Sequence, residues 1–401
     1  MNPPMLSFEQ ALERLALAAR PLADFEQVET ADACGRVLAR PLISGIDVPG
    51  RDVSMMDGYA LACAEVAAPG ARLRVSQRIP AGSVGVPLAP GSAARIFTGA
   101  PVPEGADAVV MQELCAHEAH TVQVNHAPHP GEWITRRGAD IGRGSEVLAA
   151  GTRIGPQHAG LAASVGAARL PVVRRLKIAL FSTGSELVQP GEPLPEGAIY
   201  NSNRTTLRAL AARLGCAVQD FGIVPDRLDA TRAALRDAAA GADLILTSGG
   251  VSVGEEDHVR PAVEAEGRLD LWRIAIKPGK PLAFGAVGDA AFIGLPGNPV
   301  SSFVTFLMLV RPFILRMQGV RPQPPRPLRL AAGFDWPRPD ARREFLRCRR
   351  AADRTVEVYP NQSSAVLTST AWADGLVDNP PGVAIRRGDE VSFLPFSELL
   401  A

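Results

Sequence analysis

The sequence predicts a multidomain protein of α/β and β segments, whose largest domain is a doubly wound, mostly parallel sheet. Three observations support this fold class. Residues 176–318 alternate apolar strand-like runs with helical segments, residues 27–145 contain short strand-like runs broken by Gly and Pro, and residues 328–401 carry short alternating strands without a clear helix. Strand–helix alternation is typical of a parallel sheet with helices on both faces, whereas short strands in series indicate β domains.

The N-terminal segment predicts a helix, and a second helical segment follows the first β-rich region. Residues 7–19 place apolar side chains on one helical face after Ser7, a possible N-cap, and Pro156 stands at the expected first position of a helix at 156–167. We expect these two helices to pack together. The β-rich region between them is then an insertion into a discontinuous helical or mixed domain.

In the alternating region, the pattern assigns individual elements. The expected strands are residues 176–181, 217–224, 244–247, 271–276 and 291–293, and the expected helices are 204–214, 228–239 and 299–317. Ligands of such sheets bind at the carboxyl ends of the strands.

A Pro-rich linker at 321–327 separates this α/β region from a small C-terminal β barrel or sheet. A chain of 401 residues is long enough to give several domains a core of their own. The expected domains are a helical or mixed domain at 1–26 and 146–175, an inserted β-rich domain at 27–145, an α/β domain at 176–325 and a C-terminal β-barrel-like domain at 326–401.

The bulk composition excludes several classes of protein. The net charge is zero, which argues against a general nucleic-acid binder with a basic face. Apolar runs such as 302–310 are shorter than a membrane span, and the N-terminus lacks the pattern of a signal peptide, so we expect a cytoplasmic protein without a membrane segment. Five scattered cysteines without a Cys-x-x-Cys pair predict free thiols, with neither zinc nor disulfides.

Lysine is rare in this chain, and two of its three lysines stand three residues apart. Lys and Arg together number 42, but only Lys177, Lys277 and Lys280 are lysine. The last two flank Pro278 and Gly279 in one stiff turn. Lysine is a compact point charge with rotatable donors, which suits a small tetrahedral anion in a tight pocket. Chance clustering is the alternative explanation.

Two neighbouring segments favour an anion site. A Gly/Ser loop follows the expected strand 244–247, where Gly249 and Gly250 supply backbone N–H donors of the kind that cradle phosphates. Another strand–turn–helix junction contains Pro296 and Pro299, which fix the loop shape, and Ser301 near the start of the next helix. Together with the lysine pair, these segments predict one polyanion site.

Beside the three segments above stand further motifs at residues 52–60, 95–103, 138–141, 182–187, 200–204, 343–347 and 363–369. Together they resemble the motifs of the molybdopterin molybdenumtransferases, the MoeA family of bacterial relatives of the gephyrin E domain. The resemblance spans nearly the whole chain. It implies an L-shaped homodimer of four-domain subunits, with an active site between the α/β, molybdopterin-binding domain of one subunit and the β domain of the other.

The resemblance also implies an activity. The family inserts molybdate into adenylylated molybdopterin, uses Mg²⁺, releases AMP and produces molybdenum cofactor. The partners implied are a molybdopterin adenylyltransferase upstream and acceptor molybdoenzymes downstream.

The resemblance assigns roles to individual residues as well. It implies Lys277, Lys280, Ser301, Arg347 and Ser369 as molybdate-binding positions, and a charged cage with hydroxyls is a suitable oxyanion site. It implies Ser252 as a substrate contact, together with the loop residues Gly249, Gly250, Pro296 and Pro299. Asp57, Thr98 and Asp140 would reach the partner subunit's site. The resemblance also implies Asp257 and Glu186 as catalytic residues. Each follows a strand end, where Mg²⁺ could bind with few protein ligands beside phosphates, and Asp226 is a third candidate ligand of this metal.

Several of these residues have simpler explanations. Asp57 could form an Asx-turn, Asp140 could shape a turn, Thr98 could cap a strand end, Glu186 could be a first-turn helix acid and Arg347 could form a salt bridge. Two other functions also remain open. A molybdopterin adenylyltransferase shares the α/β domain but does not need the flanking β domains, and a molybdopterin-binding scaffold or carrier would not need a charged pocket. A paralogue that uses tungstate is a further alternative.

Overall fold

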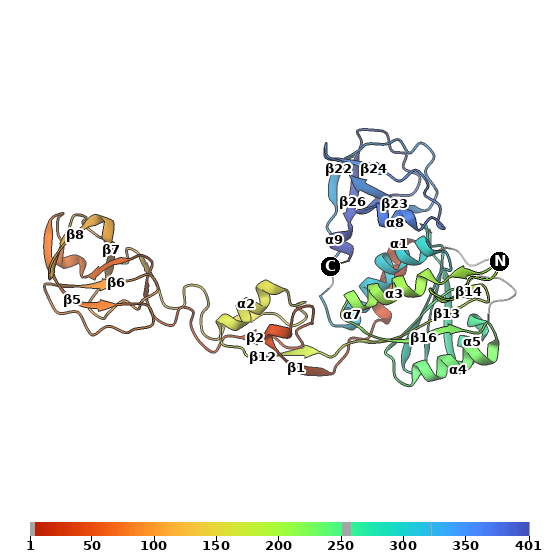
Figure 1. Cartoon of the computed structure of the whole chain (residues 1–401), viewed down its shortest axis with the longest axis horizontal. Coiled ribbons are helices and arrows are strands. Elements are labelled where there is room, and N and C mark those ends of the chain that lie inside the picture. Colours follow the sequence, from red (N-terminus) through yellow and green to blue (C-terminus); the bar gives the residue numbers. More distant parts are fainter. Residues whose placement is uncertain (1–4, 251–257, 322, 401) are drawn as a thin grey trace.

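The computed structural model describes residues 5–250, 258–321 and 323–400 of the chain. Figure 1 shows an elongated molecule. The α/β domain and the C-terminal domain lie together at one end, and the inserted β domain lies at the other, joined to them through a middle unit that contains α2. The chain is therefore multidomain, as the sequence predicts.

The α/β domain is built on a six-stranded sheet with the strand order β16-β13-β17-β21-β20-β18. Four neighbouring strands are parallel. At one edge β20 pairs antiparallel with β21, and β18 pairs antiparallel with β20, so only β20 runs in the opposite direction. The mostly parallel sheet expected from the alternating pattern is thus confirmed. Its strands are β13 (Lys177–Thr183), β16 (Ala217–Val224), β17 (Leu244–Ser248), β18 (Gly267–Arg273), β20 (Pro281–Val287) and β21 (Ala290–Leu295).

Alternation along the strands creates two cores, one on each face of this sheet. In β13, Ile178 and Leu180 point into the larger core, whereas Ala179 and Phe181 point into the smaller one. The larger core is covered by α3 (Ser202–Arg213) and by one long helix, Pro299–Met317, composed of α6 (Pro299–Thr305), the π-helical turn η4 (Phe306–Val310) and α7 (Arg311–Met317). The smaller core is covered by α4 (Leu228–Ala239) and α5 (Val259–Glu266).

By length and composition, helix Pro299–Met317 is apolar enough to cross a membrane. However, 72% of its most apolar window is buried inside the protein, so the helix packs as the core helix of a globular domain does.

The edge of the sheet differs from the prediction. One strand was expected at 271–276, but β18 ends at Arg273, and β19 (Ile276–Lys277) joins a different sheet. Strand β20 was not expected, because Pro281 and Gly285 usually interrupt strands. Here the glycine is required, since a Cβ at Gly285 would approach the carbonyl oxygen of Arg268 to 2.0 Å.

The N-terminal helix packs where the sequence did not place it. Ser7 caps α1 (Phe8–Ala18) in a capping box with Gln10, as expected. Yet the buried side chains of α1 belong to the larger core of the α/β domain, where α1 contacts α7. Helix α2 (Pro156–Ser164) lies instead in the core of the middle unit. The expected packing of the two helices against each other is therefore wrong, because the apolar stripe of α1 is buried by the larger domain.

The middle unit contains two short antiparallel strand pairs beside α2. These are β1 (Phe25–Glu29) with β12 (Arg169–Val173), and β2 (Leu42–Ile43) with β11 (Glu146–Leu148). The 3₁₀ turn η1 (Thr30–Asp32) lies between β1 and β2. Both strands leading into the inserted domain and both strands returning from it pass through this unit.

The inserted domain is β-rich, as predicted. Its six-stranded sheet has the order β7-β4-β6-β5-β9-β8, and a short pair β3–β10 lies beside it. The elements are β3 (Val53–Ser54), β4 (Gly58–Leu61), η2 (Cys63–Glu65), β5 (Ala71–Ile79), β6 (Ser92–Ile96), β7 (Ala108–Met111), η3 (Gln112–Leu114), β8 (Cys115–Glu118), β9 (Thr121–Val124) and β10 (Ile134–Thr135).

The C-terminal domain is a closed five-stranded barrel, in which β23 pairs with both β24 and β25. Strand β19 of the α/β region adds to this barrel by pairing in parallel with β23, so the two domains share a sheet. The prediction of no helix here misses two short ones. The elements are β22 (Leu328–Ala332), β23 (Arg343–Arg350), β24 (Thr355–Val358), α8 (Thr368–Trp372), β25 (Gly375–Asn379), β26 (Glu390–Pro395) and α9 (Phe396–Leu399).

Candidate functional site

A cavity of about 1070 Å³ lies where the α/β domain meets the barrel. The residues at the carboxyl ends of β13, β17 and β21 line it, which is where parallel sheets bind ligands. The short parallel pair β14 (Leu187–Val188) and β15 (Ile199–Tyr200) forms part of its wall, and residues 362–365 of the barrel form another part. Nine of the predicted site residues line this cavity: Glu186, Asp226, Gly249, Gly250, Lys277, Lys280, Pro296, Pro299 and Ser301.

The Gly249–Gly250 turn approaches its surroundings closely. Both residues have positive φ angles, +88° and +64°, a region that favours glycine. A Cβ on Gly250 would come within 2.7 Å of Thr183 Oγ1, so a larger residue would not fit. The beginning of the predicted Gly/Ser loop thus lies on the cavity wall. Ser252 and Asp257, predicted as substrate and metal contacts, lie outside the described residues.

The two predicted lysines lie on the same wall but differ in their partners. Nζ of Lys277 lies 3.2 Å from Oε1 of Glu344 and 3.4 Å from Oδ2 of Asp340. The ammonium of Lys280, in contrast, has no hydrogen bond or ion pair within the described chain. No acid among the described residues therefore compensates the charge of Lys280.

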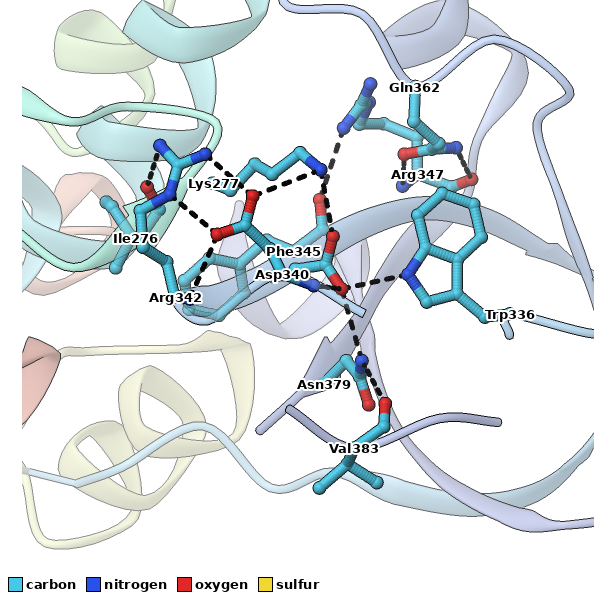
Figure 2. A network of polar contacts seen from close by, with 11 residues as sticks. Ile276, Lys277, Trp336, Asp340, Arg342, Phe345, Arg347, Gln362, Asn379 and Val383 are labelled. Atoms are coloured by element: carbon cyan, nitrogen blue, oxygen red, sulfur yellow. Dashed lines mark hydrogen bonds and ion pairs between the residues drawn. The ribbon is translucent and has the colours of Figure 1, made fainter. Parts of the chain in front are cut away.

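Asp340 is held by a second cation. Arg342, which also lines the cavity, donates two hydrogen bonds to the carboxylate of Asp340, over 2.9 and 2.8 Å (Figure 2). These hydrogen bonds hold the pKa of Asp340 well below its ordinary value, with smaller contributions from the charges of Arg342 and Lys277. Asp340 is thus an anion at neutral pH.

Arg347 lies behind the barrel part of the wall and is 1% exposed. Its guanidinium donates to Oγ of Ser369 over 3.2 Å and to the carbonyl oxygens of Phe345 and Ser363, both over 3.3 Å. Gln362, which lines the cavity, pairs with the backbone of Arg347. No carboxylate of the described chain contacts this guanidinium, and burial lowers the pKa of Arg347 to about 10.

Two acids on the cavity wall have no partner among the described residues. The carboxylates of Glu186 and Asp226 form no hydrogen bond or ion pair with the described residues, although both line the cavity. No group of three or more His, Cys, Asp or Glu side chains gathers for a metal ion in the part of the chain that the structure describes. One or two carboxylates fit Mg²⁺, which usually keeps several waters and completes its shell with substrate phosphates.

Polar atoms without partners also lie at the cavity. Thr183 Oγ1 and Asn201 Nδ2 are buried without a hydrogen bond to any described residue, and both residues line the cavity. Asn201 Oδ1 meanwhile caps α3 by accepting from the N–H of Arg204. Buried polar groups are nearly always paired, so these atoms indicate a polar ligand.

Three predicted residues lie far from this cavity. Asp57 precedes β4, Thr98 follows β6 and Asp140 follows β10, all in or beside the inserted β domain at the other end of the molecule (Figure 1). The backbone N–H and the hydroxyl of Thr98 both donate to Oδ1 of Asp57 over 2.8 Å, which lowers the pKa of Asp57. Within one chain, the fold does not bring these residues to the lysine pair.

Comparison with known proteins identifies the family of this chain. Three family models match in order: the MoeA N-terminal region (domain I and II) at residues 6–166, a probable molybdopterin binding domain at 179–316 and the MoeA C-terminal region (domain IV) at 329–396. The chain is 37% identical over 392 residues to molybdopterin molybdenumtransferase 2 of Mycobacterium tuberculosis, and the match covers 94% of this chain and 95% of that protein.

The chain belongs to the molybdopterin molybdenumtransferase family. It is a transferase of molybdenum cofactor biosynthesis. A second relative, the molybdopterin molybdenumtransferase of Haemophilus influenzae, is 42% identical over 317 residues, with 79% of this chain and 78% of that protein covered. A solved structure, the molybdopterin biosynthesis MoeA protein of Pyrococcus horikoshii, superposes with a TM-score of 0.85 at 28% identity and covers 97% of this chain and 99% of that chain.

Within this molybdopterin molybdenumtransferase fold, the sequence reasoning missed the residues around Lys277. Glu344, Asp340, Arg342 and Trp336 form the network of Figure 2, and none of them was assigned a role. One signal was present. Glu344 stands directly before an apolar pair in a predicted strand segment, and an acid in a buried strand usually has a specific cationic partner.

Proposed function

We propose that this chain inserts molybdate into adenylylated molybdopterin and releases AMP, which yields molybdenum cofactor. The observation that carries the proposal is the charge arrangement at the cavity. Lys280 and the buried Arg347 have no acidic partner among the described residues, whereas Glu186 and Asp226 are free carboxylates on the same cavity. A site with both cations and carboxylates that lack partners among the described residues suits a substrate that combines an oxyanion, phosphates and a metal ion.

Each group has a part in this reaction. Lys280 and Arg347 attract the molybdate dianion, and Ser369 orients the guanidinium through its hydrogen bond. The N–H of Gly249 donates to the carbonyl oxygen of Leu295, so the N–H of Gly250 is the donor of this turn that would hold a phosphate of the substrate. Glu186 and Asp226 would hold Mg²⁺, which when bound neutralises phosphate charge and favours departure of AMP.

The transfer balances in two parts. The phosphoanhydride bond of adenylylated molybdopterin breaks, an oxygen of water or molybdate forms the new phosphorus–oxygen bond, and AMP leaves. The two dithiolene sulfurs bond to molybdenum, and one molybdate oxygen leaves as water with the two thiol protons.

We further propose that the active protein is a homodimer in the cytoplasm. Asp57, Thr98 and Asp140 lie too far along the molecule to serve the cavity of their own chain (Figure 1), so they would act at a partner's cavity. The five free cysteines agree with a reducing compartment. Molybdopterin adenylyltransferase would supply the substrate, and acceptor molybdoenzymes would take the product.

The direct test is AMP release from purified adenylylated molybdopterin with Mg²⁺. We expect release that depends on molybdate and is strongly reduced in Glu186→Gln. Tungstate has the same charge and shape, so a parallel assay shows which oxyanion this chain prefers. Retention of the adenylylated pterin without AMP release under either oxyanion would reject the insertase and leave a carrier or scaffold. Consumption of ATP would indicate an adenylyltransferase instead.

A further inference from the structure

Glu344 is a fully buried acid whose carboxylate is surrounded by donors. It is 0% exposed, and Oε2 accepts from Nε1 of Trp336 over 2.8 Å, from the N–H of Asp340 over 3.2 Å and from Nδ2 of Asn379 over 3.3 Å. Its other oxygen, Oε1, accepts from Nζ of Lys277 over 3.2 Å. A buried carboxylate is costly unless it is satisfied in this way, so Glu344 is fixed in one orientation.

The pairing of two strands places Glu344 beside the lysine. Strand β19 of the α/β region pairs in parallel with β23 of the barrel, and Lys277 lies directly opposite Glu344 in that register. In Figure 2 the Lys277 side chain is extended. Ion pairs join its ammonium to Asp340 and to Glu344. The register therefore sets the position of this ammonium on the cavity wall, and two acids hold it there.

The local charges balance without a ligand. Lys277 and Arg342 are two cations, and Glu344 and Asp340 are two anions, all in contact through the ion pairs of this network. The charge of Lys277 is therefore already compensated, whereas Lys280 has no acidic partner in the part of the chain that the structure describes. A lysine ammonium has three N–H donors, and at least one remains after it donates to Glu344 and contacts Asp340. What Lys277 can offer a ligand is a donor at a fixed place.

We propose that Glu344 is a positioning residue of the insertion reaction, which holds the Lys277 ammonium so that a remaining N–H meets the oxyanion. Asp340, itself fixed by Arg342, is the second support. The proposal rests on the proposed function. It assigns the two lysines different tasks: Lys280 supplies uncompensated charge, and Lys277 supplies orientation.

The kinetic test is a double-mutant cycle with Glu344→Gln and Lys277→Ala. Each single variant should raise the KM for molybdate about tenfold, with a smaller change in kcat, as expected for loss of one oriented hydrogen bond to a charged group. Because Glu344 acts through Lys277, the double variant should be no worse than Lys277→Ala alone. Fully additive losses would overturn the proposal. Glu344→Asp, which keeps the charge, should recover part of the affinity.

A matched control excludes a general effect of removing an acid from the barrel. Glu357 lies in the same barrel and pairs with Arg349 on the surface, so Glu357→Gln should leave the KM unchanged. Circular dichroism checks that Glu344→Gln is folded. If it is not, Asp340→Asn removes the second support and is judged by the same cycle with Lys277→Ala.

A second measurement is independent of turnover. Because the chain has only three lysines, protein labelled with ¹⁵N-lysine gives three ammonium NMR signals, and Lys277→Arg identifies one of them. Glu344→Gln should move or broaden the Lys277 signal and leave the Lys177 signal in place. An unchanged Lys277 signal would overturn the positioning role even in an active enzyme. Conversely, wild-type protein without AMP release would reject the proposed function while this spectrum still decides the contact.

Discussion

Nε of Arg347 donates a hydrogen bond to Oγ of Ser369 across 3.2 Å, and both side chains are buried in the barrel. Ser369 in turn donates to the carbonyl oxygen of Val366, so its hydroxyl is fixed and presents a lone pair to the guanidinium. All hydrogen-bond partners of the Arg347 guanidinium in the described chain are neutral oxygens. Since a buried cation without a counter-ion is costly, its retention next to a cavity is best explained by an anionic ligand.

Arg347→Met should separate the effect of this buried cation on protein stability from its role in oxyanion binding. We expect the variant to unfold at a temperature equal to or above that of the wild type without oxyanion, because an uncompensated buried charge is removed. Molybdate at about 100 times its Kd should stabilise the wild type by about 2.7 kcal/mol, and the variant much less. Thermal unfolding with and without molybdate measures both.

The matched control is Arg343→Met on the same strand. Arg343 donates two hydrogen bonds to Asp378. The substitution therefore removes these hydrogen bonds from Asp378 and should destabilise the protein, but molybdate should still stabilise the variant. Equal molybdate stabilisation in wild type and Arg347→Met would contradict the assignment of Arg347.

Lys280→Ala should weaken oxyanion binding more through charge than through geometry. We expect the KM for molybdate to rise about tenfold or more, and the activity that remains to depend less on salt, since one uncompensated cation is lost. Steady-state AMP release at low and high NaCl gives both values. Lys177→Ala is the control. Lys177 is the first residue of β13, whereas the cavity lies at the carboxyl end of that strand. An equal effect of the two variants would argue against a specific role for Lys280.

Glu186→Gln and Asp226→Asn should alter the dependence on Mg²⁺. Both carboxylates are free at the cavity, so their neutralisation should raise the Mg²⁺ concentration needed for half-maximal AMP release by about tenfold. Asp237→Asn, on the exposed side of α4, is the matched control. A Mg²⁺ titration that coincides with that of the wild type would remove the two acids from the metal site.

Acid should weaken the contact between the barrel and the α/β domain through Asp340. Hydrogen bonds from Arg342 lower the pKa of Asp340 in the folded protein, so the unfolded chain takes up this proton at a higher pH than the folded one. The stabilisation is complete above the unfolded pKa of about 4 and is lost as the pH falls toward the lowered folded value.

The urea concentration at the midpoint of unfolding should therefore decrease as the pH is lowered from 7 to 3. In Asp340→Asn the midpoint at pH 7 should be lower and the fall smaller, because the titrating group is gone. A fall as large as that of the wild type would show that Asp340 contributes little to acid sensitivity.

Subunit mixing tests the proposed dimer. At molybdate concentrations below the wild-type KM, Asp57→Asn and Lys280→Ala should each strongly reduce the activity of the homodimer, but a mixed dimer would contain one cavity with both groups intact. Unfolding and refolding the two variants together should restore about a quarter of wild-type activity, since about half of the dimers are mixed. Asp57→Asn mixed with Thr98→Ala, two variants of the same domain, should restore none. If neither mixture recovers activity, either Asp57 and Lys280 act within the same chain or the protein does not form the proposed dimer.

The sequence by itself determined much of this protein. Strand–helix alternation identified β13, β16, β17 and β21, because their apolar runs lie between clear helices, and it placed the Gly249–Gly250 turn at a strand end. The rarity of lysine singled out Lys277 and Lys280, and both line the cavity. These features are local, so a pattern of neighbouring residues is sufficient to show them.

Only the tertiary structure decided how the lysines differ. Glu344 is 67 positions from Lys277, and nothing local in either segment links them. The parallel pairing of β19 with β23 makes them neighbours, and it arises because the chain leaves the α/β sheet after Arg273 to join the barrel. The place of α1 was decided in the same way, by the larger core that buries its apolar face. Propensity and spacing act over a few residues, whereas charge compensation and burial depend on which distant segments the fold brings together.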